Sequence, residues 1–176
     1  MSFYFYFPAA LANMGAVISF KIPLIKNLDY PIDFGLRFWG KRLVGEHKKI
    51  GGFIYGLFCG IFWGSIKFIF LDPIFKNFVF FYFSFWENLW FYFLLSLGAL
   101  LGDLTKSIIK RLLNIAPHKM WIPFDEIDHT VGAILLVFLF YPISLSVIIT
   151  TIGLYFFLHL ITNVIGYKLG LKKVPY

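Results

Sequence analysis

The chain has 176 residues, of which 60% are hydrophobic, 22% aromatic and only 14% charged. Soluble domains carry about 25% charged residues, so this composition excludes an ordinary water-soluble enzyme or binding module and indicates an all-α integral membrane protein. The net charge of +7 does not indicate a nucleic-acid-binding protein, because no soluble basic face accompanies it. We expect a single polytopic membrane domain that covers residues 1–176.

Five apolar segments are predicted to cross the membrane as helices. Several approach or exceed 18 apolar residues, the length that crosses a hydrocarbon layer of about 30 Å. Asp72 and Pro73 end the second segment, and Pro142 marks a tight turn between the last two. In chain order, the five segments cover roughly 3–25, 50–71, 78–102, 126–141 and 144–167.

The third segment is interrupted by Glu87 and Asn88. Trp86 and Trp90 flank this pair, and tryptophan favours the headgroup level of a membrane. We therefore expect residues 74–87 to follow the outer interface and the span to begin near Asn88. The alternative places Glu87 inside the bilayer, where it would have a functional role.

Lysine and arginine indicate how the helices are oriented. Six of these residues lie in the loop 26–49, four in the segment 103–125 and three in the C-terminal tail, whereas the opposite-side segments contain only Lys76. By the positive-inside rule, both loops and the C-terminus face the cytoplasm. We expect a multi-pass cell-membrane protein with its N-terminus outside and its polar site on the cytoplasmic side.

The first cytoplasmic loop, "PIDFGLRFWGKRLVGEHKKIGG", alternates glycine with cations. Glycine lets a backbone approach a ligand closely, and lysine and arginine neutralise phosphate. The spacing is not that of a P-loop. The loop is predicted either to anchor the chain against anionic lipid headgroups or to bind phosphate.

The segment "GALLGDLTKSIIKRLL" continues the third span without a helix breaker. Asp103, Ser107, Lys110 and Arg111 share one face of such a helix, because their spacing is i, i+4, i+7 and i+8. The small residues Gly98, Ala99 and Gly102 are predicted to let a neighbouring helix approach closely.

The stretch "FDEIDHTVGA" places three acids within four residues, at the start of the fourth span. Asp125 and Asp128 share a face at i, i+3, whereas Glu126 points about 100° away and is not expected to be a ligand. One interpretation is an ordinary helix start, because acids there are favoured by the helix dipole. The other is a metal site, because clustered carboxylates repel unless a cation joins them. Together with Asp103, these oxygens suit Mg²⁺ shared with a phosphate-bearing substrate.

These pieces resemble the CDP-archaeol synthase family, which is related to the CDP-diacylglycerol synthases. The matching segments are "PIDFG", "GKRLVGEHK", "GDLTKSIIKR", "FDEIDHTVGA" and "HLITNVIGYKLGLKKVPY", in the family's order and over almost the whole chain. The resemblance implies a five-helix membrane enzyme that joins CTP to a lipid phosphate and releases pyrophosphate with Mg²⁺. The implied acceptor is archaetidic-acid-like, for example 2,3-bis-(O-geranylgeranyl)-sn-glycerol 1-phosphate.

Roles follow for individual residues on this hypothesis. Asp103, Asp125 and Asp128 are predicted to bind the metal, and Lys110 and Arg111 to steady the departing pyrophosphate. His129 is expected to cap the site or to be structural, and the pair His159 and Asn163 is expected to join helices. The predicted substrate-binding residues are Asp33, Lys41, Arg42, Lys48 and Ser107.

Two other functions are compatible with the sequence. A CTP-dependent polyprenol or lipid kinase of related architecture would release CDP instead of pyrophosphate. A non-catalytic homologue is suggested by the run from Lys49 to Gly52, which departs from the family's usual Thr-Trp-Arg-Gly.

Overall fold

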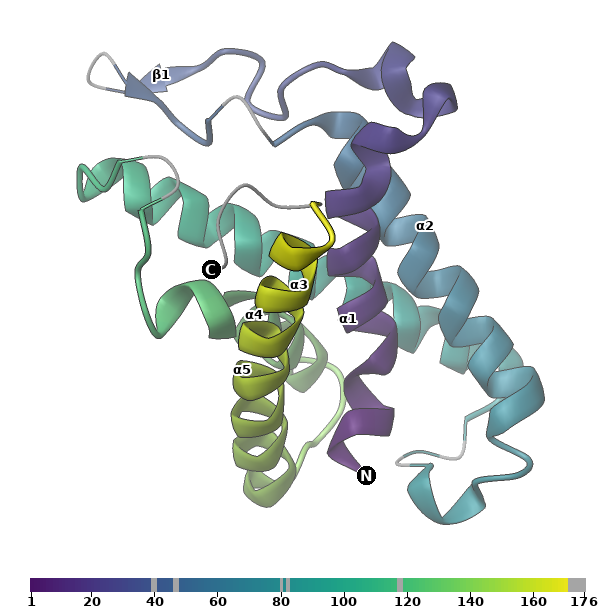
Figure 1. Cartoon of the computed structure of the whole chain (residues 1–176). Helices are drawn as coiled ribbons and strands as arrows, with labels where there is room; N and C mark the ends of the chain where they lie inside the picture. Colours follow the sequence, from purple (N-terminus) through teal and green to yellow (C-terminus); the bar gives the residue numbers. More distant parts are fainter. Residues whose placement is uncertain (39–40, 46–47, 80, 82, 117–118, 171–176) are drawn as a thin grey trace.

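The structure is a computed structural model. It describes the whole chain except residues 39–40, 46–47, 80, 82, 117–118 and 171–176, and at residues 24, 26, 38 and 41 it describes the backbone alone. The main elements are five helices, which confirms the predicted all-α fold (Figure 1): α1 (Ser2–Ile18), α2 (Ile50–Ile66), α3 (Phe85–Leu112), α4 (Phe124–Phe138) and α5 (Leu145–Lys168). Short elements join them: η1 (Ser19–Lys21), η2 (Pro23–Leu28), β1 (Arg37–Phe38), β2 (Lys41–Arg42), η3 (Lys67–Leu71) and η4 (Lys76–Phe78).

Four of the helices have the length and apolar character of membrane spans. Extended by their adjoining short turns, they cover Ser2–Lys21, Ile50–Leu71, Phe85–Leu112 and Leu145–Lys168. α4 differs, because its 15 residues reach only about 22 Å at 1.5 Å per residue, less than the hydrocarbon thickness of about 30 Å. The predicted fourth span of 126–141 is therefore a shorter helix, which ends at Phe138.

The start of α3 explains the polar interruption in the third apolar segment. Ser84 and Glu87 form a capping box, in which the Ser84 hydroxyl accepts from the Glu87 backbone N–H and the Glu87 carboxylate accepts from the Ser84 N–H. Asn88 is buried, and its side chain donates to the Phe83 carbonyl oxygen over 3.0 Å. The helix therefore begins three residues before Asn88, and Glu87 is an exposed part of its cap.

The helices α3 and α4 pack more closely than ordinary side chains allow. A Cβ atom built on Gly98 would lie 2.7 Å from the Ala133 Cα, and one built on Gly102 would lie 2.2 Å from the Asp128 carbonyl oxygen. Gly132 of α4 meets the same stretch of α3 from the other side. The predicted close approach at Gly98 and Gly102 is confirmed, and it joins the polar end of α3 to the start of α4.

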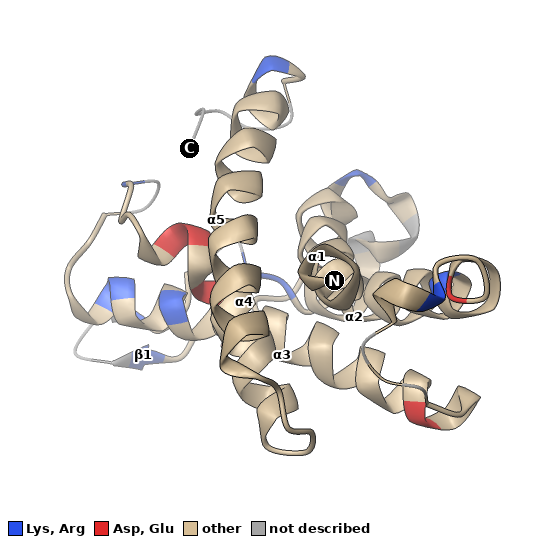
Figure 2. Cartoon of the chain, turned by 90° about the horizontal axis from the view of Figure 1, so that it is seen from below, with Lys and Arg blue, Asp and Glu red and all other residues tan. Residues whose placement is uncertain are grey.

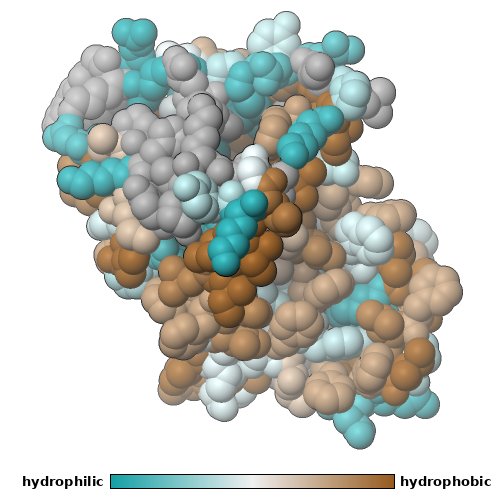
Figure 3. Space-filling model, viewed as in Figure 1, coloured by the Kyte–Doolittle hydropathy of each residue, from teal (hydrophilic) through white to brown (hydrophobic). Residues whose placement is uncertain are grey.

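Polar and apolar surfaces are separated in the fold. Hydrophilic residues gather over the segment between α1 and α2 at the top of Figure 3, and hydrophobic residues cover the helices below. The core below that polar face contains Phe5, Phe91, Leu95 and Tyr155.

Candidate active site

Three acidic side chains from two helices converge on one lysine. The Lys106 Nζ of α3 lies within ion-pair distance of each carboxylate: 3.3 Å from Asp103 Oδ1, 3.2 Å from Asp125 Oδ1 and 3.0 Å from Asp128 Oδ2. The acidic start of α4 lies beside the basic positions of α3 in Figure 2. The structure thus brings together the three acids predicted to bind a metal.

The local sequence explains this convergence. α3 continues to Leu112 without a breaker, so Asp103 and Lys106 stand one turn apart on its last turns. Asp125 lies in the first turn of α4 and Asp128 follows at i+3 on the same face. The contact between Gly102 and the Asp128 carbonyl then sets the two helices close enough for their carboxylates to share one cation.

Each carboxylate also has a partner other than Lys106. Asp103 Oδ2 contacts the Lys48 ammonium. The two oxygens of Asp125 lie 3.0 and 2.9 Å from Lys110 Nζ, and Asp125 Oδ2 accepts from the Trp121 backbone N–H over 2.7 Å.

Asp128 is the most buried of the three acids, with a side chain that is 5% exposed. Its Oδ1 accepts from the His129 backbone N–H over 2.7 Å. Its Oδ2 lies 3.0 Å from the Lys106 Nζ. Lys106 is therefore the partner of this oxygen within the cluster.

The charges of the cluster balance. Three carboxylates face the three ammonium groups of Lys48, Lys106 and Lys110. Carboxylates at such short separations would repel one another without these cations. The interaction of acids with the helix dipole at the start of α4 therefore does not by itself account for this cluster.

The loop before α2 is closed by backbone hydrogen bonds, which position Lys48. The Ile32 N–H donates to the Lys48 carbonyl and the Ile50 N–H donates to the Tyr30 carbonyl, each over 2.9 Å. Lys48 reaches Asp103, whereas Lys49 turns away and pairs with exposed Asp29 over 2.9 Å. Lys49 therefore adds no charge to the acidic cluster.

Asp33 organises this loop from inside. Its carboxylate accepts from the Gly35 N–H over 3.0 Å, from the Val44 N–H over 3.1 Å and from Arg42 Nη2 over 3.2 Å. Burial alone would raise the pKa of Asp33, but these donors outweigh it and hold the pKa below its ordinary value. The predicted substrate residues Asp33 and Arg42 thus contact each other, and the side chain of Lys41 lies outside the described structure.

Three further predicted residues lie on the same part of α3. The Ser107 hydroxyl donates to the Asp103 carbonyl over 2.8 Å. Lys110 also donates to the Lys119 carbonyl over 2.6 Å, which ties the connection between α3 and α4. Arg111 packs against the loop at Gly45, where an added Cβ would lie 3.1 Å from the Arg111 Nη2. Gly45 has a φ of +102°, a backbone conformation that favours glycine.

Two residues at this site were not foreseen. Lys106 is one of the four basic residues in the segment 103–125 that indicate orientation, although its i, i+3 spacing from Asp103 puts both on one helix face. Glu126 is 1% exposed, and its Oε2 has no hydrogen-bond partner among the described residues. Its angular separation from Asp125 gave no sign that this position would be buried.

A chain of buried polar groups continues inward from α4. The Tyr6 hydroxyl of α1 lies 2.7 Å from His129 Nδ1, and His129 Nε2 lies 2.8 Å from His159 Nδ1 of α5. This contact confirms that His159 joins helices, and it gives His129 a structural position between α1 and α5. Asn163, one turn beyond His159, is also buried.

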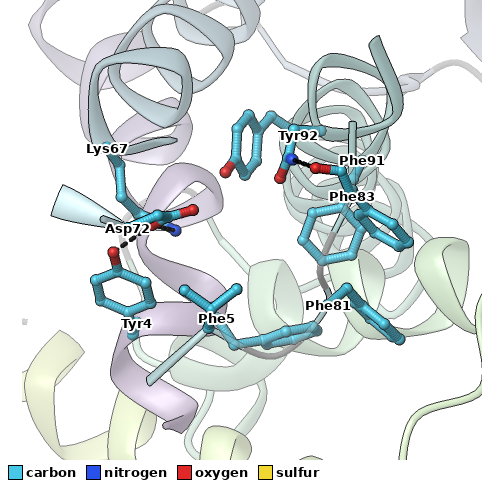
Figure 4. A pocket seen from close by; sticks show the side chains of 10 residues that line it. Tyr4, Phe5, Lys67, Asp72, Phe81, Phe83, Phe91 and Tyr92 are labelled. Atoms are coloured by element: carbon cyan, nitrogen blue, oxygen red, sulfur yellow. Dashed lines mark hydrogen bonds and ion pairs between the residues drawn. The ribbon is translucent and has the colours of Figure 1, made fainter. Parts of the chain in front are cut away.

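A second polar cluster lies at the other end of α2. The buried Lys67 ammonium pairs with Asp72 Oδ1 over 2.8 Å and sits 3.8 Å from the centre of the Tyr4 ring. Figure 4 shows Tyr4 and Lys67 meeting Asp72, with Phe5 and Phe81 beyond them. The cavity between these groups is about 20 Å³, which suits a single water molecule rather than a substrate.

The carboxylates of the acidic cluster are candidate ligands for a magnesium ion. It presents carboxylate oxygens, the donors that Mg²⁺ prefers, from three side chains around one cationic centre. Among the described residues no three His, Cys, Asp or Glu side chains are arranged to hold a metal ion, and the Lys106 ammonium lies between the three acids. These carboxylate oxygens would suit a divalent cation if the Lys106 ammonium left the position between them.

Comparison with known proteins places the chain in a family. A family model described as CarS-like, CDP-archaeol synthase, matches residues 1–176. A CDP-archaeol synthase of Methanocaldococcus jannaschii is 35% identical over 174 residues, which cover 98% of this chain and 94% of the relative. One of Methanospirillum hungatei is 39% identical over 158 residues, which cover 83% of this chain and 89% of the relative.

A solved structure has a similar fold. It is described as an intramembrane enzyme for archaeal membrane lipid biosynthesis, and it superposes with a TM-score of 0.72 at 25% sequence identity. The match covers 92% of this chain and 91% of the solved chain. Together with the four long apolar helices, it shows that this chain is a multi-pass membrane protein. On these grounds the chain belongs to the CDP-archaeol synthase family.

Proposed function

We propose that this chain is a CTP-dependent cytidylyltransferase that converts a membrane lipid phosphate into a CDP-lipid and releases pyrophosphate, in phospholipid biosynthesis. The family supports the overall reaction. The observation that carries the proposal is the convergence of Asp103, Asp125 and Asp128 on one cationic position. The proposed acceptor is an archaetidic-acid-like lipid such as 2,3-bis-(O-geranylgeranyl)-sn-glycerol 1-phosphate.

The proposed reaction is an in-line displacement at phosphorus. An oxygen of the lipid phosphate attacks the α-phosphorus of CTP, the bond between that phosphorus and the α–β bridging oxygen breaks, and pyrophosphate leaves with the bridging oxygen. Such chemistry depends mainly on positioning and on neutralising charge. A bound Mg²⁺ would supply charge neutralisation at the phosphate oxygens.

The basic residues around the acids have complementary roles in this proposal. Lys48 and Lys110 each contact one acid, which holds their ammonium groups at the edge of the cluster. Arg111 lies under the loop at Gly45, where its guanidinium could receive two oxygens of the departing pyrophosphate. Ser107 and the loop residues Lys41 and Arg42 are proposed to help bind the substrates.

The proposed site faces the cytoplasm, where CTP is available, and the N-terminus lies outside. The lysines and arginines of the two long polar segments support this orientation through the positive-inside rule. The lipid substrate would keep its tails among the apolar helices while its phosphate reaches the acidic cluster. We propose that residues 1–176 act as one membrane domain.

The proposal can be tested with Asp128→Asn. We expect CDP-lipid formation from labelled CTP to fall by about 100-fold, because one charged ligand of the cluster is lost. Asp29→Asn is the matched control, since Asp29 pairs with Lys49 at an exposed position, and it is expected to keep wild-type turnover. Wild-type turnover by Asp128→Asn contradicts the metal assignment.

The released product separates the proposed function from its alternatives. Pyrophosphate is expected from cytidylyl transfer, whereas a CTP-dependent lipid kinase releases CDP. Calorimetry with CTP and Mg²⁺ provides a second measurement on the purified protein. Absence of CTP binding there would favour the non-catalytic homologue.

A further inference from the structure

The position at the centre of the three acids is held by a side chain of this chain itself. Lys106 Nζ lies 3.0–3.3 Å from one oxygen of each carboxylate, and the lysine side chain is 17% exposed. A divalent cation that uses those same oxygens cannot share the position with an ammonium group, because the two positive charges repel each other. Metal entry therefore requires Lys106 to move.

The remaining contacts keep the acids in place when Lys106 leaves. Asp103 still contacts Lys48, and Asp125 still contacts Lys110 and the Trp121 backbone N–H. Asp128 still accepts from the backbone N–H of its neighbour in α4. The carboxylates are thus positioned independently of the lysine that lies between them.

Lys106 has a suitable side chain for such an exchange. Its four-carbon stem is flexible, and its ammonium is a compact charge with three donors. We propose that Lys106 occupies the metal position in the nucleotide-free protein and moves onto the triphosphate when the divalent cation and CTP bind. This inference rests on the proposed function, because it assigns Lys106 to the same site.

The charge balance of the cluster leads to a coupling between the two ligands. The three carboxylates are already neutralised by three ammonium groups, so a divalent cation alone brings uncompensated positive charge. The triphosphate supplies the missing negative charge and a new partner for the displaced ammonium. Divalent cation and CTP should therefore each bind more tightly in the presence of the other.

The test is a direct measurement of metal binding without nucleotide. Mn²⁺ is titrated, with detection by electron paramagnetic resonance, into purified wild-type protein, Lys106→Met and the control Lys168→Met. Lys168 is an exposed residue at the end of α5, so its variant loses the same charge away from the acids. We expect Lys106→Met to bind Mn²⁺ about tenfold more tightly than the control, a typical size for such coupling.

A second prediction concerns the coupling itself. CTP is expected to increase Mn²⁺ affinity in the wild type by several-fold, and this increase should be much smaller in Lys106→Met, because the group that pairs with the triphosphate is gone. Lys106→Arg keeps the positive charge and is expected to keep the weak Mn²⁺ binding of the wild type. Equal or weaker Mn²⁺ binding by Lys106→Met than by the control overturns the inference.

Loss of the lysine also leaves three carboxylates without their shared cation. Lys106→Met is therefore expected to melt at a lower temperature than the control without metal and to gain more from added Mn²⁺, since a ligand that binds the folded state stabilises it. Should this variant not be obtained folded, Lys106→Gln provides the same neutral replacement with a polar side chain. Absence of any extra stabilisation by Mn²⁺ in these variants also overturns the inference.

A negative result for the role of Lys106 can be distinguished from failure of the proposed cytidylyltransferase function. A wild-type protein that neither binds CTP nor releases pyrophosphate would contradict cytidylyl transfer, whatever its metal affinity. The comparison of Mn²⁺ binding between Lys106→Met and Lys168→Met needs no nucleotide and no turnover. It therefore reports only on whether Lys106 competes for the carboxylates.

Discussion

The contact between Gly102 and α4 makes a sharp prediction about catalysis. In Gly102→Ala, the new Cβ would lie 2.2 Å from the Asp128 carbonyl oxygen and 3.1 Å from the Gly132 Cα. Contacts between carbon and carbonyl oxygen normally lie at about 3.3–3.6 Å, so the two helices would have to separate by about 1 Å. The atom that would be pushed belongs to the backbone of a predicted metal ligand.

Two magnitudes follow from this displacement. Overpacking of this kind destabilises a fold by about 1–3 kcal/mol, and a misplacement of about 1 Å at a reacting centre lowers the rate by about 100-fold. We therefore expect Gly102→Ala to melt at a lower temperature in detergent and to form CDP-lipid from labelled CTP about 100 times more slowly.

The control is Gly153→Ala in α5, where the new Cβ would meet no atom within 4 Å. Alanine is favoured over glycine in a helix by up to about 1 kcal/mol, so this variant should be as stable as the wild type or more so, with unchanged turnover. Wild-type turnover and melting by Gly102→Ala would refute the argument that this glycine sets the distance between the acids.

Three other substitutions test contacts outside the acidic centre. Asp33→Asn should lower the free energy of unfolding at pH 7 by about 1–3 kcal/mol. Because the pKa of Asp33 is held low, thermal melts should show this difference above about pH 4 and lose it as the pH falls further. A difference that stays constant with pH would contradict this prediction. Asp72→Asn leaves the buried Lys67 without its charged partner and should destabilise by about 3–5 kcal/mol, while the double variant with Lys67→Met should recover part of that loss in melting experiments; no recovery argues against the pair. His159→Leu leaves His129 Nε2 without the partner now 2.8 Å away and should cost about 1–3 kcal/mol of stability, which an unchanged melting temperature would disprove.

The sequence predicts the helices well because apolar runs of membrane length leave few alternatives. The sequence is less informative about whether an apolar helix is long enough to cross the membrane. The acidic start of α4 and its apolar continuation suggested a full span, but the helix ends at Phe138 after 15 residues. Nothing in the local pattern near Phe138 marks that end, because the apolar run continues into Tyr141.

The candidate site was predictable where residues share a helix face. Periodicity grouped Asp125 with Asp128, and it placed Asp103 on the polar face of another helix. Helical periodicity gives no information about contacts between residues that are far apart in the sequence. Tyr6 and His129 are 123 positions apart, and only the packing of α1 against α4 brings them together.

Lys106 shows a different limit of sequence reasoning. A lysine near the cytoplasmic end of a span has an adequate explanation as an orientation charge, so its spacing from Asp103 attracted no separate hypothesis. Asp33 shows the reverse case, since its place among glycines and cations suggested a ligand contact, while the structure encloses its carboxylate with donors of its own loop. The roles of Lys106 and Asp33 depend on the groups that they contact in the fold, and the sequence alone does not identify those groups.

The pairing of acids with lysines also explains why such a cluster is tolerated at the edge of a membrane. Unpaired carboxylates there would be destabilising, yet the three ammonium groups come from two separate parts of the chain. Lys48 belongs to the loop before α2, whereas Lys106 and Lys110 belong to α3. The ion pair of Lys48 therefore ties the loop to α3, and those of Lys106 and Lys110 tie α3 to α4.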